Sequence, residues 1–70
     1  MAQTRRLQTD ADFQEALDRQ LVIRVFENDH VVSSGGGIVR FAEDLIVIQT
    51  GVSDISYFQR SSCEFFSVRR

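Results

Sequence analysis

The chain is 70 residues long and carries 8 basic and 10 acidic residues, for a formal net charge of −2. Its 43% of hydrophobic and 26% of charged residues are typical of a folded soluble protein and exclude a disordered tail. No apolar run approaches the ~18 residues of a membrane span, and no apolar stretch follows the first arginines as in a secretory signal. We therefore expect a cytoplasmic protein without membrane partners.

The composition also limits metal and disulfide chemistry. A single cysteine excludes an internal disulfide, and a single histidine argues against a zinc site, so no metal and no cofactor are expected. A domain of roughly 60–70 residues buries only about 60% of its chain surface, and its core rarely supplies more than ~3–5 kcal/mol. Because neither a disulfide nor a structural metal is expected to stabilise this small core, we expect copies of the chain to associate.

The first part of the chain predicts an arm and a short helix. Residues 1–8 are polar without periodicity and are expected to form a loose arm. Thr9 or Asp10 can cap a helix over residues 9–20, in which Phe13 and Leu17 share one narrow apolar stripe.

From residue 21 the pattern changes to short strands. Runs rich in β-branched and aromatic residues alternate with polar turn clusters at 27–30 and 50–54. Three glycines at 35–37 interrupt the second run, where glycine permits a sharp bend. We predict one mainly β domain, in which the helix precedes a strongly bent, five-stranded antiparallel, partly open barrel over residues 21–68.

This order of elements resembles the Sm-like family, and within it the bacterial Hfq branch, over about residues 8–68. The resemblance rests on an apolar pair in the helix, a G-x-I-x-x-F pattern at the bend, an apolar third strand, a V-S segment before the fourth strand and an arginine after it. These anchors are Phe13 and Leu17, then Gly36, Ile38 and Phe41, residues 45–48, then Val52, Ser53, Ile55 and Tyr57, and Arg60 with Ser61. An unrelated SH3-like or OB-like barrel is the alternative.

The resemblance implies a homo-oligomeric ring of about five to seven copies. The fourth strand of one copy would pair with the fifth strand of the next, which would cover two otherwise open sheet edges. The apolar residues of these strands are then expected at the subunit interface: Ile55, Tyr57, Phe58, Phe65, Phe66 and Val68. Because successive side chains point to opposite faces of a strand, Phe65 and Phe66 are expected on different faces.

The resemblance further implies non-covalent binding of single-stranded RNA, or of DNA, through loops at the pore. Arg60 would stack on a base and contact phosphate, Phe41 would stack, and Asp44 would accept hydrogen bonds from a base edge. Arg40 and Ser61 complete the expected site. The structural alternatives are an Arg60 ion pair on the surface, Phe41 in the core and Asp44 as a turn residue.

Several positions depart from the family pattern. Ala42 and Ile46 stand where the first Sm motif carries Asp and Asn, and Phe58 and Gln59 replace the Lys-His pair by which the Hfq branch binds uridine. A ring that serves only assembly or protein contact, without nucleic acid, is therefore the alternative function. No cluster of nucleophile, base and acid is present in the pattern, so we expect no enzyme.

Overall fold

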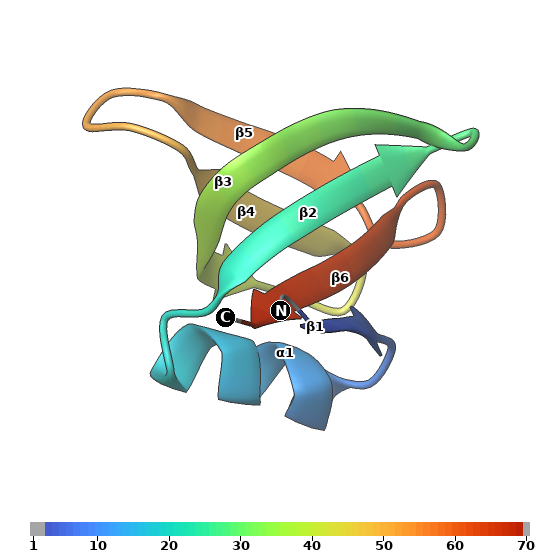
Figure 1. The fold of residues 1–70 in the computed structure, drawn as a ribbon, viewed down its shortest axis with the longest axis horizontal. Helices are drawn as coiled ribbons and strands as arrows, with labels where there is room; N and C mark the ends of the chain where they lie inside the picture. The colour runs from blue at the N-terminus through green and yellow to red at the C-terminus, as the bar shows by residue number, and fades with distance from the viewer. Residues whose placement is uncertain (1–2, 70) are drawn as a thin grey trace.

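The computed structural model describes residues 3–69, which form a mainly β fold with one short helix (Figure 1). The elements are β1 (Gln3–Leu7), α1 (Asp10–Asp18), β2 (Val22–Glu27), β3 (His30–Phe41), β4 (Leu45–Gln49), β5 (Ile55–Gln59) and β6 (Glu64–Arg69). The strands pair antiparallel in the order β1-β6-β2-β3-β4-β5, so β1 and β5 are the edges of an unclosed sheet. The expected helix and curved antiparallel sheet are confirmed, with six strands instead of five.

Strand β1 is the main difference from the sequence prediction. Residues 1–8 were expected to be a loose arm, but Gln3–Leu7 pairs with β6 along its whole length, from Gln3 opposite Arg69 to Leu7 opposite Phe65. Leu7 is 5% exposed and belongs to the core. The burial of this one leucine, together with the backbone pairing, orders a segment whose sequence is otherwise polar.

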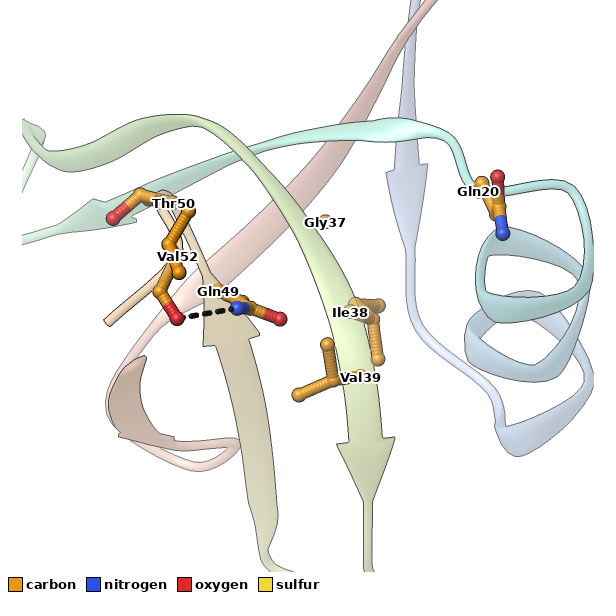
Figure 2. Close-up of a pocket in the computed structure, with 8 residues that line it drawn as sticks. Gln20, Gly37, Ile38, Val39, Gln49, Thr50 and Val52 are labelled. Atoms are coloured by element: carbon orange, nitrogen blue, oxygen red, sulfur yellow. Dashed lines mark hydrogen bonds between the residues drawn. The ribbon is translucent and has the colours of Figure 1, made fainter. Parts of the chain in front are cut away.

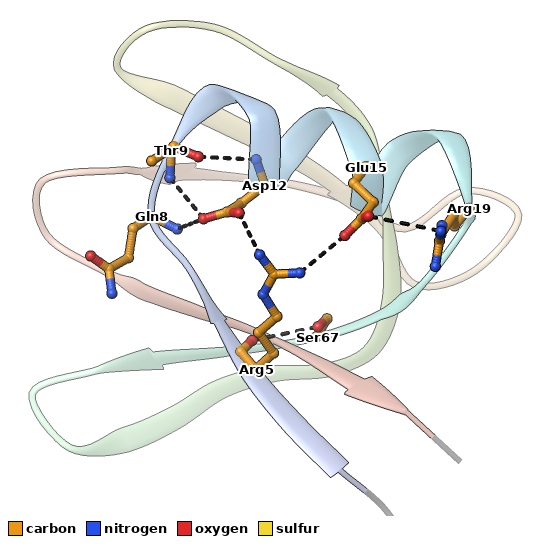
Figure 3. A network of polar contacts seen from close by, with 7 residues as sticks. All are labelled: Arg5, Gln8, Thr9, Asp12, Glu15, Arg19 and Ser67. Carbon is orange, nitrogen blue, oxygen red and sulfur yellow. Dashed lines mark hydrogen bonds and ion pairs between the residues drawn. The ribbon is translucent and has the colours of Figure 1, made fainter.

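Helix α1 begins at a capping box and lies across one side of the sheet. The Thr9 hydroxyl accepts from the Asp12 N–H at 3.1 Å, and the Asp12 carboxylate accepts from the N–H groups of Gln8 and Thr9 at 3.0 and 3.1 Å (Figure 3). These backbone donors hold the pKa of Asp12 below its ordinary value. Gln20, with φ of 53°, turns the chain from the helix into β2.

Strand β3 bends where the glycines occur, as the sequence predicts. Its first half pairs with β2, up to Gly36 opposite Ile23, and its second half pairs with β4, from Gly37 opposite Gln49. One strand therefore belongs to both halves of the sheet and folds it into a half-open barrel. A Cβ on Gly36 would lie 2.6 Å from Thr50 Cγ2, so only glycine fits at this crossing.

The core fills the space between α1 and the concave side of the sheet. Phe13 lies at its centre, with its ring centroid 5.6 Å from that of Phe65 and 6.0 Å from that of Phe41. The buried core consists of Leu7, Phe13, Ala16, Ile23, Val25, Ile38, Ile46, Ile48 and Phe65. Within residues 3–69, no helix is long and apolar enough to cross a membrane.

Candidate nucleic-acid interface

The structure places Arg60, the main residue of the predicted RNA site, in an internal network. Its Nη1 donates to Asp10 Oδ1 at 2.7 Å and to the Ala42 carbonyl at 2.9 Å, and its guanidinium lies 4.6 Å from the centroid of the Phe13 ring. The side chain is only 17% exposed. Arg60 therefore ties the start of α1 to two loops of the sheet, and its guanidinium is already occupied.

Two of the other predicted site residues, Phe41 and Asp44, lie near Arg60 at the same end of the barrel. Phe41 is half-buried against Phe13, and the Asp44 carbonyl accepts from the Arg60 N–H at 3.0 Å. Arg40 and Ser61 are exposed. The structure thus brings three of the five residues together, but the exposed Asp10, Glu43 and Asp44 give this end an acidic rim that opposes phosphate.

The predicted subunit-interface residues separate into three groups. Phe65 is 2% exposed in the core, so its placement at an interface was wrong, and Phe58 also packs against the core. Ile55 and Tyr57 are 49% and 66% exposed on edge strand β5. Phe66 and Val68 lie on β6, whose outer edge is covered by β1. Only the β5 part of the predicted interface is open.

A second group of aromatic and cationic side chains lies on the convex face of β1, β6 and β2. Arg6 and Arg24 are both register partners of Phe66, from opposite sides. We call these three residues the Arg–Phe–Arg row. Because adjacent strands are roughly 4.8 Å apart, the two arginine Cα atoms are about 10 Å apart with the phenylalanine midway between them.

The row faces away from the helix. The neighbouring residues Leu7, Phe65 and Val25 point into the core, so alternation along each strand directs the row to the other side. Phe66 is half-buried and is held edge to face by Phe26, at a centroid distance of 5.4 Å and an interplanar angle of 81°. The face of the sheet therefore presents a braced aromatic ring between two exposed arginines.

Ion pairing distinguishes Arg6 and Arg24 from the neighbouring Arg5. Arg5 points to the other face of β1 and forms ion pairs with Asp12 at 2.9 Å and Glu15 at 3.2 Å (Figure 3). Among the residues that the structure describes, neither Arg6 nor Arg24 makes an ion pair. Their charges are therefore available to an anionic ligand.

The residues on the two sides of the Arg–Phe–Arg row differ in charge. On one side the next cross-strand row is Thr4, Val68 and Val22, which carries no charge. On the other side, Glu64 is the register partner of Phe26 and presents an exposed carboxylate. An anionic chain on this face is expected to extend over the uncharged row and away from Glu64.

Sequence reasoning missed this site because it depends on β1. The residues Arg24 and Phe66 alternate outward on predicted strands and could have been paired, but Arg6 belonged to a segment expected to be a loose arm.

In the part of the chain from 3 to 69, no three His, Cys, Asp or Glu side chains gather to hold a metal ion. No family model, curated protein or solved structure matches the chain significantly.

Proposed function

We propose that this protein is a non-catalytic binder of single-stranded RNA that holds its ligand on the Arg–Phe–Arg row. The observation that supports the proposal is the half-buried aromatic ring of Phe66 between two exposed arginines without ion pairs. Proteins that bind single strands combine such stacking platforms with cationic contacts to the backbone. One base stacks on Phe66, and Arg6 and Arg24 contact the phosphates on either side.

The overall acidity of the chain limits the kind of binding. A net charge of −2 does not favour indiscriminate attraction of polyanions, which needs a broadly cationic surface. The row supplies only two local positive charges, so affinity has to come largely from stacking. We therefore expect modest affinity, preference for single strands over duplexes, and a shallow dependence on salt.

The proposal is tested by fluorescence anisotropy with a labelled single-stranded RNA of about 12 nucleotides, within the usual site size of roughly 4–16. Phe66→Leu is expected to weaken binding about tenfold, because a stacked base contributes ~1–3 kcal/mol. Phe66→Tyr keeps a stacking ring and is expected to bind like the parent protein. Circular dichroism of both variants verifies that the sheet is intact.

The arginines are tested by the salt dependence of binding. Each phosphate contact contributes ~0.7 to the slope of log affinity against log salt for single strands, so the double variant Arg6→Gln/Arg24→Gln should lower the slope by about 1.4. Arg40→Gln is the matched control. It removes an exposed arginine that belongs to the site predicted from the sequence and lies outside the Arg–Phe–Arg row. Loss of binding with Arg40→Gln, or no binding by the parent protein, would refute the row as the RNA site.

A further inference from the structure

The two edges of the sheet differ in their suitability for pairing with another chain. Edge strand β1 carries the adjacent charges of Arg5 and Arg6, which discourage edge-to-edge pairing. Edge strand β5 reads Ile-Ser-Tyr-Phe-Gln and carries no charge. Its outer face carries two exposed apolar side chains, Ile55 and Tyr57, and the nearest charge in the same cross-strand row is that of Arg40, which lies two strands away on β3.

The hydrogen bonds around β5 show which of its backbone groups are open. The Arg60 N–H donates to the Asp44 carbonyl at 3.0 Å, and the Thr50 N–H donates to the Asp54 carbonyl at 2.9 Å. In an antiparallel ladder, hydrogen-bonded positions alternate, so the even-numbered residues from 54 to 60 direct their backbone groups toward β4. The N–H and C=O groups of Ile55, Tyr57 and Gln59 therefore point to the free edge.

This pattern is symmetric about Tyr57, the middle residue of β5. Two antiparallel copies centred there place Tyr57 opposite its equivalent and Ile55 opposite Gln59. All three outward positions then exchange both backbone bonds, about six in total. The tyrosine rings meet as a cross-strand aromatic pair, and no like charges face each other.

The ring mode expected from the sequence uses a different edge and is obstructed. In that mode, β5 of one copy would pair with the outer edge of β6 in the next copy. Here β1 already occupies that edge in antiparallel register over all of Gln3–Leu7. With β1 in place, the edge that remains both open and uncharged is that of β5.

We propose that two copies of this chain form a symmetric dimer by pairing their β5 strands antiparallel about Tyr57. A hollow of about 490 Å³ is lined by residues of β3, of β4 and of the loop that leads to β5, among them Val39, Gln49 and Val52, and no residue of β5 lines it (Figure 2). The Gln49 side chain donates to the Val52 carbonyl at 3.2 Å and holds the loop at its rim (Figure 2). Pairing brings Ile55 and Tyr57 of the two copies together on one face of the joined sheet. The dimer does not depend on RNA binding, because it uses the opposite end of the strand order.

Disulfide trapping tests the register in a Cys63→Ser background. Residues of a hydrogen-bonded antiparallel pair have Cα atoms about 5.5 Å apart, which suits a disulfide. Tyr57→Cys is expected to give a cross-linked dimer on mild oxidation. Ile55→Cys, on the same face, is the matched control and is expected to remain uncross-linked, because its equivalent in the partner lies opposite Gln59. Equal cross-linking of both variants would overturn the register.

Native mass spectrometry tests the assembly itself. The parent protein is expected to be a dimer, and Tyr57→Lys, which places two like charges on the symmetry axis, should raise the dissociation constant on the order of tenfold or more. Val31→Lys adds the same charge at a 52% exposed valine that pairs with β2 and should leave the dimer intact. A monomeric parent protein, or a ring of more copies, would overturn the proposal.

Discussion

At the scale of single residues, Arg60 shows how one guanidinium can organise a small fold. It contacts Asp10 at the start of α1, the Ala42 carbonyl between β3 and β4, and the ring of Phe13. Asp10 and Phe13 belong to α1 and Ala42 to the loop between β3 and β4, so Arg60 joins segments that are far apart in the sequence. The arginine that the sequence assigns to ligand binding is, in the structure, a link between the helix and the sheet.

Replacement of Arg60 by glutamine is expected to reduce the free energy of unfolding by about 2 kcal/mol, because charge-assisted hydrogen bonds and the cation–π contact are lost. Urea denaturation followed by circular dichroism measures the change. The control is Asp10→Asn, whose side chain is 74% exposed, so the ion pair is screened and the expected loss is below about 1 kcal/mol. Equal stability of Arg60→Gln and the parent protein would contradict the structural role.

The sequence could not assign Arg60 to this role because its partners are remote. Asp10 lies 50 residues away in the sequence, and no local pattern indicates a partner at that distance. By contrast, the opposite orientations of Phe65 and Phe66 follow from strand alternation alone and are confirmed. Local periodicity predicts which way a side chain points but not which distant segment it meets.

At the scale of elements, the bend of β3 decides the curvature of the sheet. Gly36 lies against β4 and the loop after it, where a Cβ would approach Ile48 Cγ2 to 2.7 Å and the Gln49 carbonyl to 2.9 Å. At Gly37 a Cβ would lie 3.7 Å from the nearest atom, the Leu21 carbonyl. Of these two adjacent glycines, close contacts therefore require a missing side chain only at Gly36.

This difference predicts different costs for the same substitution. Gly36→Ala should lower the free energy of unfolding by about 1–3 kcal/mol, as overpacking does elsewhere, whereas Gly37→Ala should be nearly neutral. Thermal unfolding is a suitable measurement, since 1 kcal/mol corresponds to roughly 4–8 °C in a domain of this size. If both variants melted alike, the crossing at Gly36 would not be the tight point of the fold.

Most elements were predictable because their signals are local. The capped helix, the glycine bend and the turn at 27–30, where Asn28 and Asp29 adopt positive φ, all follow from neighbouring residues. Strand β1 was not predictable in this way. Among its described side chains only Leu7 is apolar, and the strand exists because β6, about 60 residues later, offers an edge for it.

At the scale of the whole molecule, β1 determines which edges are open. It covers β6, leaves β5 free and carries Arg6 into the Arg–Phe–Arg row. One polar strand therefore influences both the proposed assembly and the proposed RNA site.

Removal of residues 1–7 should open the outer edge of β6 to the β5 strand of another copy. We expect such a variant to form assemblies larger than the dimer, because a contact between two different edges repeats from copy to copy. Native mass spectrometry would measure the copy number, and circular dichroism would establish that the remaining sheet is folded. A folded variant with the mass of the parent assembly would show that β1 does not restrict assembly.

The position of β6 also has a consequence for the time at which the fold can form. This strand lies between β1 and β2, which are synthesised first, and its residue Arg69 pairs with Gln3 near the start of the chain. Contacts of such long sequence separation form slowly. While the ribosome is still synthesising residues 64–69, β1 and the outer side of β2 have no partner, and α1 lacks the Phe65 ring that packs against Phe13. The sheet can therefore be completed only after residues 64–69 have been synthesised.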